Sequence, residues 1–249
     1  MEINLLDNKT IYFTGCSYTW GAGLEMEYYH IQEGWDINKI AKENDMSVNR
    51  LENGTYDAAE YRRKHRFGNL VAKHFNINHE ILNMGNGNSN EQAYQLVERC
   101  TLSVPKFIIV QLTHFSRDGE CRDIIQKDLS QIDIENLCHK QIYRFINLEK
   151  QRTEKGHYMP KLLFIAWHKE NGVVLKKHFA DRMIPIHIDG KDYNSFEDTA
   201  EDFNNHNIRD YNKMRLCDVI LGIEDTHLSS IGHRIVADSI IKYLKNEYI

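Results

Sequence analysis

The feature that most constrains the fold is an alternation of short apolar runs with helix-length polar or amphipathic stretches. The apolar runs are hydrophobic at successive positions, which is typical of parallel strands that are covered by helices on both faces. Strands that alternate with helices predict a parallel, doubly wound α/β sheet. The runs expected to form its five strands are residues 10–15, 80–85, 106–113, 161–167 and 183–188.

The stretches between these runs are predicted to be helical. The last amphipathic segment, residues 229–246, carries apolar side chains at three- and four-residue steps, which is the pattern of a helix docked on a core. We therefore expect one domain that spans residues 1–249. The other predicted helices lie at about residues 57–75, 89–102, 121–151 and 169–181.

Two polar segments depart from this alternation. Residues 25–56 are rich in aromatic side chains and follow the first strand closely. They are predicted to form a lid or insertion over the carboxyl ends of the strands, where open α/β sheets bind ligands. Residues 189–207 are acidic and rich in Asn, and are predicted to form the opposite rim.

Composition narrows the class of protein. The chain has 249 residues, 41% of them hydrophobic, which suits a single well-packed domain. Its formal net charge of −5 argues against a nucleic-acid-binding protein. The amino-terminal residues lack a signal peptide, and no apolar run reaches the length of a membrane helix, so a cytoplasmic protein is expected. The many Asn, Lys and Ile residues are typical of an AT-rich genome and suggest a bacterial or viral origin.

The five cysteines are scattered without the spacing of a metal site or a disulfide framework. Reduced thiols are therefore expected. No metal and no cofactor are predicted.

The first predicted strand ends in a glycine-hinged turn, GCSYTWG, at residues 15–21. Ser17 in this turn has two interpretations. It can cap the next helix, since Ser is a favoured N-cap residue. It can also be a nucleophile, because a strand-to-helix turn exposes a hydroxyl where helix amides face developing negative charge. The second interpretation needs a base, since a serine hydroxyl alone is a weak nucleophile.

His227 is the candidate base. It lies between an apolar segment and the last predicted helix, and Asp225 and Glu224 precede it. A carboxylate close by can orient an imidazole and stabilise its protonated form. The alternative is a solvated acidic turn that caps the last helix through Ser229 or Ser230.

A Gly- and Asn-rich loop follows the second predicted strand. Gly87 permits close backbone approach, and Gly87, Asn88 or Asn90 can donate hydrogen bonds to an oxyanion, as can the amide of Ser17. The alternative is a turn before a helix that Ser89 or Asn90 caps.

In order and placement, these segments resemble the motifs of the SGNH (GDSL-like) hydrolases. The turn at 15–21 resembles the first block with its nucleophile, GNSN at 87–90 resembles the second, and DTHLSSIGH at 225–233 resembles the last. The resemblance implies a flavodoxin-like, three-layer α/β/α sandwich. It also implies ester hydrolysis by Ser17, His227 and Asp225, without a metal or cofactor.

The chain departs from the family pattern at three places. Cys16 replaces the usual Asp before the nucleophile, and the last block spaces Asp225 two residues before the base, so Glu224 is kept as an alternative acid. The third strand ends in QLTHFSRDG, residues 111–119, without the family's oxyanion Asn. Substitute donors or substrate contacts there are Thr113, His114 and Arg117.

Residues in and near these motifs also have other interpretations. Cys16 is a second candidate nucleophile, and a metal site of Asp225, His227 and His233 is disfavoured. Trp20 is a candidate for lining the substrate cleft, with ordinary packing as its alternative.

The sequence therefore predicts a serine esterase. Its expected reaction removes an O-acyl group, with acetyl the expected one, from a carbohydrate or a small ester. An acyltransferase and a non-catalytic glycan- or partner-binding module on the same fold are the alternatives. No nucleic acid or membrane partner is predicted, and the oligomeric state is left open.

Overall fold

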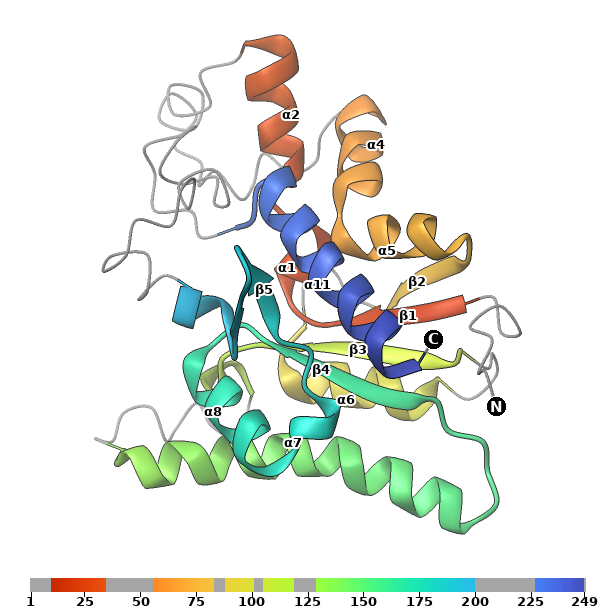
Figure 1. The fold of residues 1–249 in the computed structure, drawn as a ribbon, viewed down its shortest axis with the longest axis vertical. Coiled ribbons are helices and arrows are strands. Elements are labelled where there is room, and N and C mark those ends of the chain that lie inside the picture. Colours follow the sequence, from red (N-terminus) through yellow and green to blue (C-terminus); the bar gives the residue numbers. More distant parts are fainter. Residues whose placement is uncertain are drawn as a thin grey trace.

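The computed structural model describes residues 10–34, 56–82, 88–100, 105–118, 129–199 and 227–248. At its centre lies a four-stranded sheet with the strand order β2-β1-β3-β4, in which all three pairings are parallel (Figure 1). The predicted α/β class with a parallel sheet is confirmed. The strands are β1 (Thr10–Thr14), β2 (Asn78–Leu82), β3 (Phe107–Leu112) and β4 (Lys161–Ala166).

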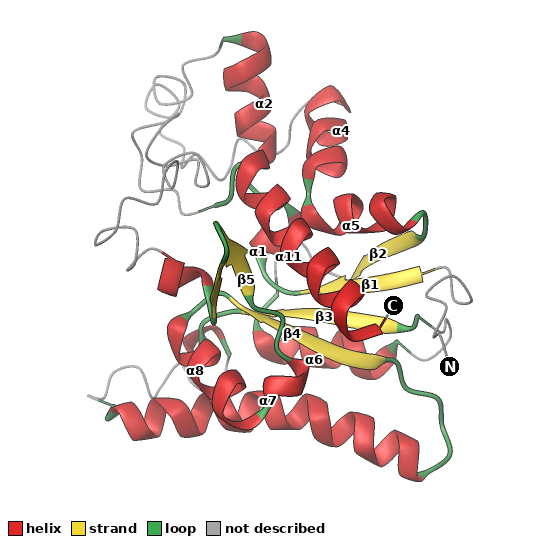
Figure 2. Ribbon diagram, in the orientation of Figure 1, coloured by secondary structure: helices red, strands yellow, loops and turns green. Residues whose placement is uncertain are grey.

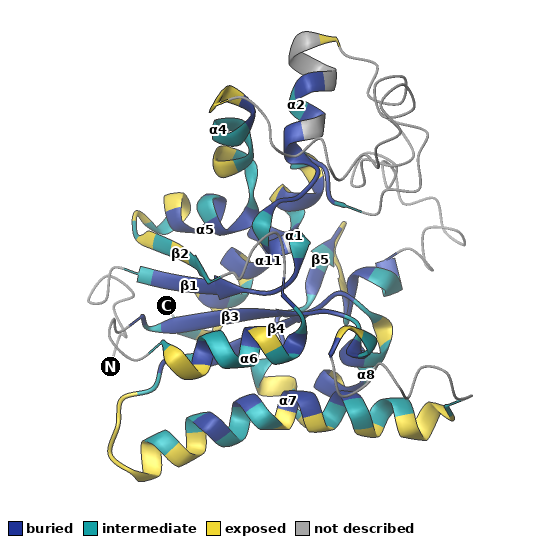
Figure 3. Cartoon of the chain, turned by 180° about the vertical axis from the view of Figure 1, so that it is seen from behind, coloured by how far each residue is buried: buried dark blue, intermediate teal, exposed yellow. Residues whose placement is uncertain are grey.

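The two middle strands are buried because helices cover them on both faces. Every residue of β3 is buried, as are four of the five residues of β1, whereas β2 at the edge is only partly covered (Figure 3). In the register of the sheet, Phe13 of β1 lies between Ile81 of β2 and Ile109 of β3. The continuous apolar runs of the sequence thus correspond to the strands, as the pattern predicts.

Helices lie on either side of the central sheet (Figure 2), and two clusters of buried hydrophobic side chains hold them to it. Phe13 and Ile109 belong to the cluster that includes α5 (Phe67–Phe75) and α11 (Ser230–Tyr248). The alternate residues of the same strands belong to the second cluster, with side chains of three other helices. These helices are α6 (Asn90–Arg99), α7 (Gln131–Glu154) and α8 (Lys169–His178).

The single helix predicted at 57–75 is two helices, α4 (Tyr56–His65) and α5. Arg66 between them has an extended backbone, with φ −65° and ψ 144°, and this ends the first helix. Ser89 caps α6 through a reciprocal capping box with Gln92, so the capping interpretation of Ser89 is confirmed.

The predicted fifth strand, residues 183–188, does not extend the central sheet. Met183 forms one parallel bridge to Phe164 of β4, and the next segment, β5 (Ile186–Ile188), pairs antiparallel with β6 (Lys191–Tyr193). The Ile184 N–H donates to the carbonyl of Phe164 at 2.8 Å, and beyond this bond the chain leaves β4 and pairs with β6 instead. Among the described residues the central sheet therefore has four strands.

Shorter elements complete the description. Ser17 begins α1 (Ser17–Trp20), and α2 (Leu24–Glu33) forms the first part of the segment predicted as a lid. Two 3₁₀ helices are η3 (Phe115–Arg117) and η5 (Ala180–Arg182). Residues 35–55 of the predicted lid and residues 200–207 of the predicted rim lie outside the described residues. No helix in the described part of the chain has the length and apolar character needed to cross a membrane.

Candidate active site

The turn after β1 is built around a glycine that no other residue can replace without strain. Gly15 has φ +158°, and a Cβ there would lie 2.8 Å from the carbonyl oxygen of Gln111 on the neighbouring strand β3. Such a distance is too short for any real side chain. The close approach of the two backbones thus explains why the strand ends in Gly and delivers Ser17 directly after it.

Gln111 holds this turn. Its Oε1 accepts hydrogen bonds from the Cys16 N–H at 3.3 Å, the Cys16 Sγ–H at 3.1 Å and the Thr19 hydroxyl at 3.1 Å. Its Nε2 donates to the carbonyl of Leu112. A side chain from β3 therefore supplies the hydrogen-bond acceptor for the turn that carries Cys16 and Ser17. The sequence signal for Gln111 is a lone polar residue in an otherwise apolar strand, and the sequence analysis missed it.

Ser17 and His227 meet across 210 positions of sequence. The Nε2 atom of His227 lies 2.9 Å from the Ser17 Oγ, and both side chains are half-buried. This distance and pairing are those of a nucleophile and its general base. Ser17 is the first residue of α1, and its hydroxyl contacts the imidazole.

Cys16 is a poor candidate nucleophile in this geometry. Its side chain is fully buried, and its Sγ–H donates to Gln111. The thiol therefore faces the interior of the turn, while the hydroxyl of Ser17 faces the imidazole.

The loop that carries His227 is fastened to α2 by Glu27. The Ser230 N–H and hydroxyl each donate to this carboxylate at 2.7 Å, which ties the amino terminus of α11 to the segment after the nucleophile. Burial raises the pKa of Glu27, and the hydrogen bonds from Ser230 oppose that rise. Sequence reasoning missed Glu27, because an acidic residue in an amphipathic helix reads as solvent-facing.

His233, which the disfavoured metal site included, is a core residue. Its side chain is fully buried, and its Nδ1 accepts a hydrogen bond from the Phe67 N–H. Burial, followed by the neighbouring His227 and Arg66, lowers the pKa of His233 to about 3. A neutral imidazole in this position packs α11 against α5.

Asn88 donates hydrogen bonds to other groups of the protein. Its backbone N–H donates to the carbonyl of Gly15 at 3.0 Å, and its Nδ2 donates to Thr14 and to the carbonyl of Leu82. Asn88 therefore fastens the loop after β2 to the end of β1. Its predicted role as an oxyanion donor is not supported.

Asn90 and Thr113 bind each other. The Asn90 Nδ2 donates to the carbonyl of Thr113 at 2.9 Å and to Gln141, and the Thr113 N–H donates back to the Asn90 Oδ1 at 2.9 Å. This reciprocal pair joins the start of α6 to the end of β3. The side-chain amide of Asn90 and the backbone N–H of Thr113 thus donate within the protein, so an oxyanion role for the Asn90 side chain is not supported either.

Three other predicted contacts have definite places. Arg117 is exposed and its Nη1 donates to the Thr113 hydroxyl at 3.5 Å. The Nδ1 of His114 lies 2.5 Å from the Ser116 hydroxyl, and burial lowers the pKa of His114. Trp20 packs under the guanidinium of Arg62 at 4.4 Å, which is the packing alternative.

The remaining site residues lie outside the description. Asp225, Glu224 and Gly87 belong to segments that the structure does not describe, so the triad acid and the glycine oxyanion donor stay predictions. Within the described part of the chain, the N–H of Ser17 has no acceptor, which leaves it available at the start of α1.

Comparison with known proteins adds no family to this geometry. The chain matches no protein-family model and is not significantly similar to any curated protein sequence.

Proposed function

We propose that this protein is a serine ester hydrolase of the SGNH type. The observation that carries the proposal is the 2.9 Å contact between the His227 Nε2 and the Ser17 Oγ at the carboxyl end of β1. Ligands of open α/β sheets bind at that end of the strands. The order β2-β1-β3-β4 agrees with the first four positions of the flavodoxin-like order, and we extend it to a three-layer α/β/α sandwich.

In the proposed reaction, Ser17 attacks the acyl carbon while His227 takes the hydroxyl proton at Nε2. A new Oγ–C bond forms, and the carbonyl oxygen becomes an oxyanion. Collapse of this intermediate breaks the ester C–O bond, and the imidazolium returns the proton to the leaving alcohol. Water, activated by the same imidazole, then releases the acid and regenerates Ser17.

Asp225 is proposed to orient His227 and to stabilise the imidazolium, with Glu224 as the alternative acid. For the oxyanion we propose the amides of Ser17 and Gly87, because Asn88 and Asn90 are engaged in structural hydrogen bonds. One missing oxyanion donor costs about 10²- to 10³-fold in rate in enzymes that rely on such a site.

The proposed substrate class is an O-acyl ester, with an acetylated carbohydrate or a small acetyl ester as the first compounds to test. If the lid excludes water, the same chemistry transfers the acyl group to an alcohol instead.

One observation favours a second candidate, a non-catalytic binding module. The side-chain amides of Asn88 and Asn90 and the backbone N–H of Thr113 donate within the protein, so the described residues offer few donors to an oxyanion. A site with a serine and a histidine but little oxyanion stabilisation can hold a ligand without turning it over.

Labelling with a fluorophosphonate, followed by intact-mass spectrometry, tests the proposal. We expect one adduct on the wild type, none on Ser17→Ala, and a labelling rate about 100-fold lower on His227→Ala, since a general base contributes that much or more. Cys16→Ala should label like the wild type.

The matched control is His74→Ala, which removes an exposed imidazole from α5 and should leave labelling unchanged. Absence of an adduct on folded wild-type protein would reject the activated serine and favour the binding module.

A further inference from the structure

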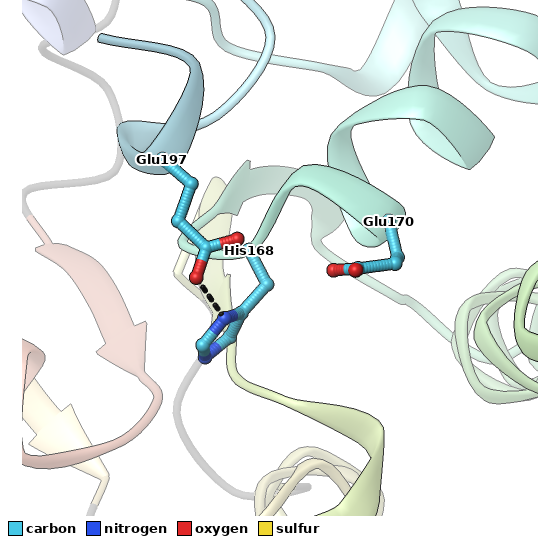
Figure 4. Close-up of side chains that lie close together, drawn as sticks. All are labelled: His168, Glu170 and Glu197. Atoms are coloured by element: carbon cyan, nitrogen blue, oxygen red, sulfur yellow. Dashed lines mark hydrogen bonds and ion pairs between the residues drawn. The ribbon is translucent and has the colours of Figure 1, made fainter. Parts of the chain in front are cut away.

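A second group of titratable side chains lies beyond the carboxyl end of β4, apart from Ser17 and His227 (Figure 4). His168 precedes α8, Glu170 belongs to the first turn of that helix, and Glu197 follows β6. Each of the three is half-buried. One nitrogen or oxygen ligand atom from each side chain lies within 4.8 Å of the others.

The group is already partly ordered around Glu197. One carboxylate oxygen lies 2.6 Å from the Nδ1 of His168, and the other accepts the Lys169 N–H at 2.9 Å. These hydrogen bonds lower the pKa of Glu197 against the opposing effect of burial. The carboxylate is therefore held both in place and in its ionised form.

Capping of α8 accounts for Glu197 but not for Glu170. Glu170 forms no hydrogen bond or ion pair with any residue in the described part of the chain, and its carboxylate points toward His168 and Glu197 (Figure 4). The cluster thus offers a carboxylate that none of the described residues engages, beside a histidine and a second carboxylate.

A further imidazole borders the group. The ring of His114 lies 4.9 Å from the ring of His168 in a T-shaped arrangement, and the charges of Glu170 and Glu197 act on it. Its Nδ1 is engaged by Ser116, which fixes the orientation of the ring.

We propose that His168, Glu170 and Glu197 form a binding site for one divalent transition-metal ion. An imidazole nitrogen combined with carboxylate oxygens suits Zn²⁺, Co²⁺ or Mn²⁺, whereas Mg²⁺ and Ca²⁺ take oxygen ligands. Three protein ligands leave at least one position for water or another oxygen ligand.

Binding of the metal releases protons. A ring nitrogen of His168 and one oxygen of each carboxylate donate a lone pair to the metal, and any proton on these atoms leaves to solvent. Affinity should therefore fall as the pH drops, because protons compete with the metal for the ligand atoms.

The test uses the full chain without a histidine tag. Zn²⁺ is titrated calorimetrically at pH 7.5, and Co²⁺ is followed by its visible absorption. We expect one saturable ion per chain. The dissociation constant should rise at least about tenfold in Glu170→Gln and in His168→Ala, since each removes one ligand, and it should rise in the wild type at pH 5.5.

The matched control is His178→Ala, which removes an exposed imidazole from the other end of the same helix and should bind like the wild type. Circular dichroism establishes that each variant is folded. Absence of saturable binding to the wild type overturns the proposal, and so does unchanged affinity in Glu170→Gln. Neither result bears on Ser17, because labelling of that residue is measured without metal.

Discussion

At the scale of single residues, the nucleophile turn depends on a side chain from a different strand. Gln111 is 4% exposed and its Oε1 accepts three hydrogen bonds from the turn. We expect Gln111→Leu to leave these donors without an acceptor and to lower the free energy of unfolding by about 1–3 kcal/mol. Urea denaturation measures this loss.

The same variant should also slow fluorophosphonate labelling of Ser17, because the turn that presents the hydroxyl is loosened. Gln151→Leu, at an exposed position of α7, is the control and should change neither stability nor labelling. Wild-type stability in Gln111→Leu would show that the three hydrogen bonds contribute nothing net.

His233 gives the protein a defined response to acid. Its pKa is about 3 in the folded protein and about 6.5 when unfolded, so between these values the unfolded chain takes up a proton that the folded chain does not. Above about pH 6.5 neither state takes up this proton, so His233 costs the protein no stability there. Below that value the free energy of unfolding falls by up to about 1.4 kcal/mol per pH unit as the pH drops toward 3.

Denaturation of the wild type and of His233→Asn between pH 7 and 4 isolates this contribution. Asn keeps an acceptor for the Phe67 N–H but cannot take up a proton, so its stability should fall less steeply with acid. Other groups, such as His79 with its pKa lowered to about 4, contribute equally to both proteins. Parallel curves would contradict the assignment.

Sequence alone predicted the residues whose chemistry is visible in their type and local setting. Ser17 follows a strand and a glycine, and His227 precedes a helix, so both could be picked out. Gln111 and Glu27 could not, because their roles arise from partners on other elements. Asn88 and Asn90 were misjudged for the same reason, since local sequence cannot say which carbonyl an amide meets.

At the scale of elements, α8 contains a glycine at a position where alanine, normally the better helix former, is expected to be worse. Ala is favoured over Gly in a helix by about 1 kcal/mol. A Cβ at Gly172, however, would lie 2.8 Å from the backbone oxygen of Asn194, where α8 crosses the chain after β6. We expect Gly172→Ala to destabilise the protein by about 1–3 kcal/mol, because backbone must move.

Thermal unfolding checks this sign. Lys176→Ala, an exposed substitution on the same helix, should stay within about 0.5 kcal/mol of the wild type. A Gly172→Ala protein more stable than the wild type would show that α8 and the crossing segment can separate without cost.

The elements were predictable where periodicity decides, and less so where one residue interrupts it. β1, β3, β4 and α11 follow from apolar patterning, whereas β2 begins at Asn78, two residues before the run predicted there. The break at Arg66 does not follow from it, since Arg is a good helix former and only the turn between α4 and α5 requires it to be extended. Pro185 was a readable signal, because a proline within an apolar run argues against a continuous central strand.

At the scale of the whole molecule, the sheet sets where chemistry can occur. Because β1, β3 and β4 are parallel neighbours, the residues that follow them lie along one edge. That edge carries Ser17, Thr113 and His168. Ser17 and Thr113 were predicted to lie there, whereas His168 and the carboxylates that approach this edge from outside the sheet, Glu27 and Glu197, were not.

The contact between Ser17 and His227 joins the first strand to the last helix. A chain emerging from the ribosome therefore holds the Ser17 turn long before His227 has been synthesised. If the proposed function holds, the serine stays an ordinary alcohol until α11 docks, and an incomplete chain carries no activated hydroxyl. Labelling of Ser17 during refolding would then report when the carboxy-terminal helix docks.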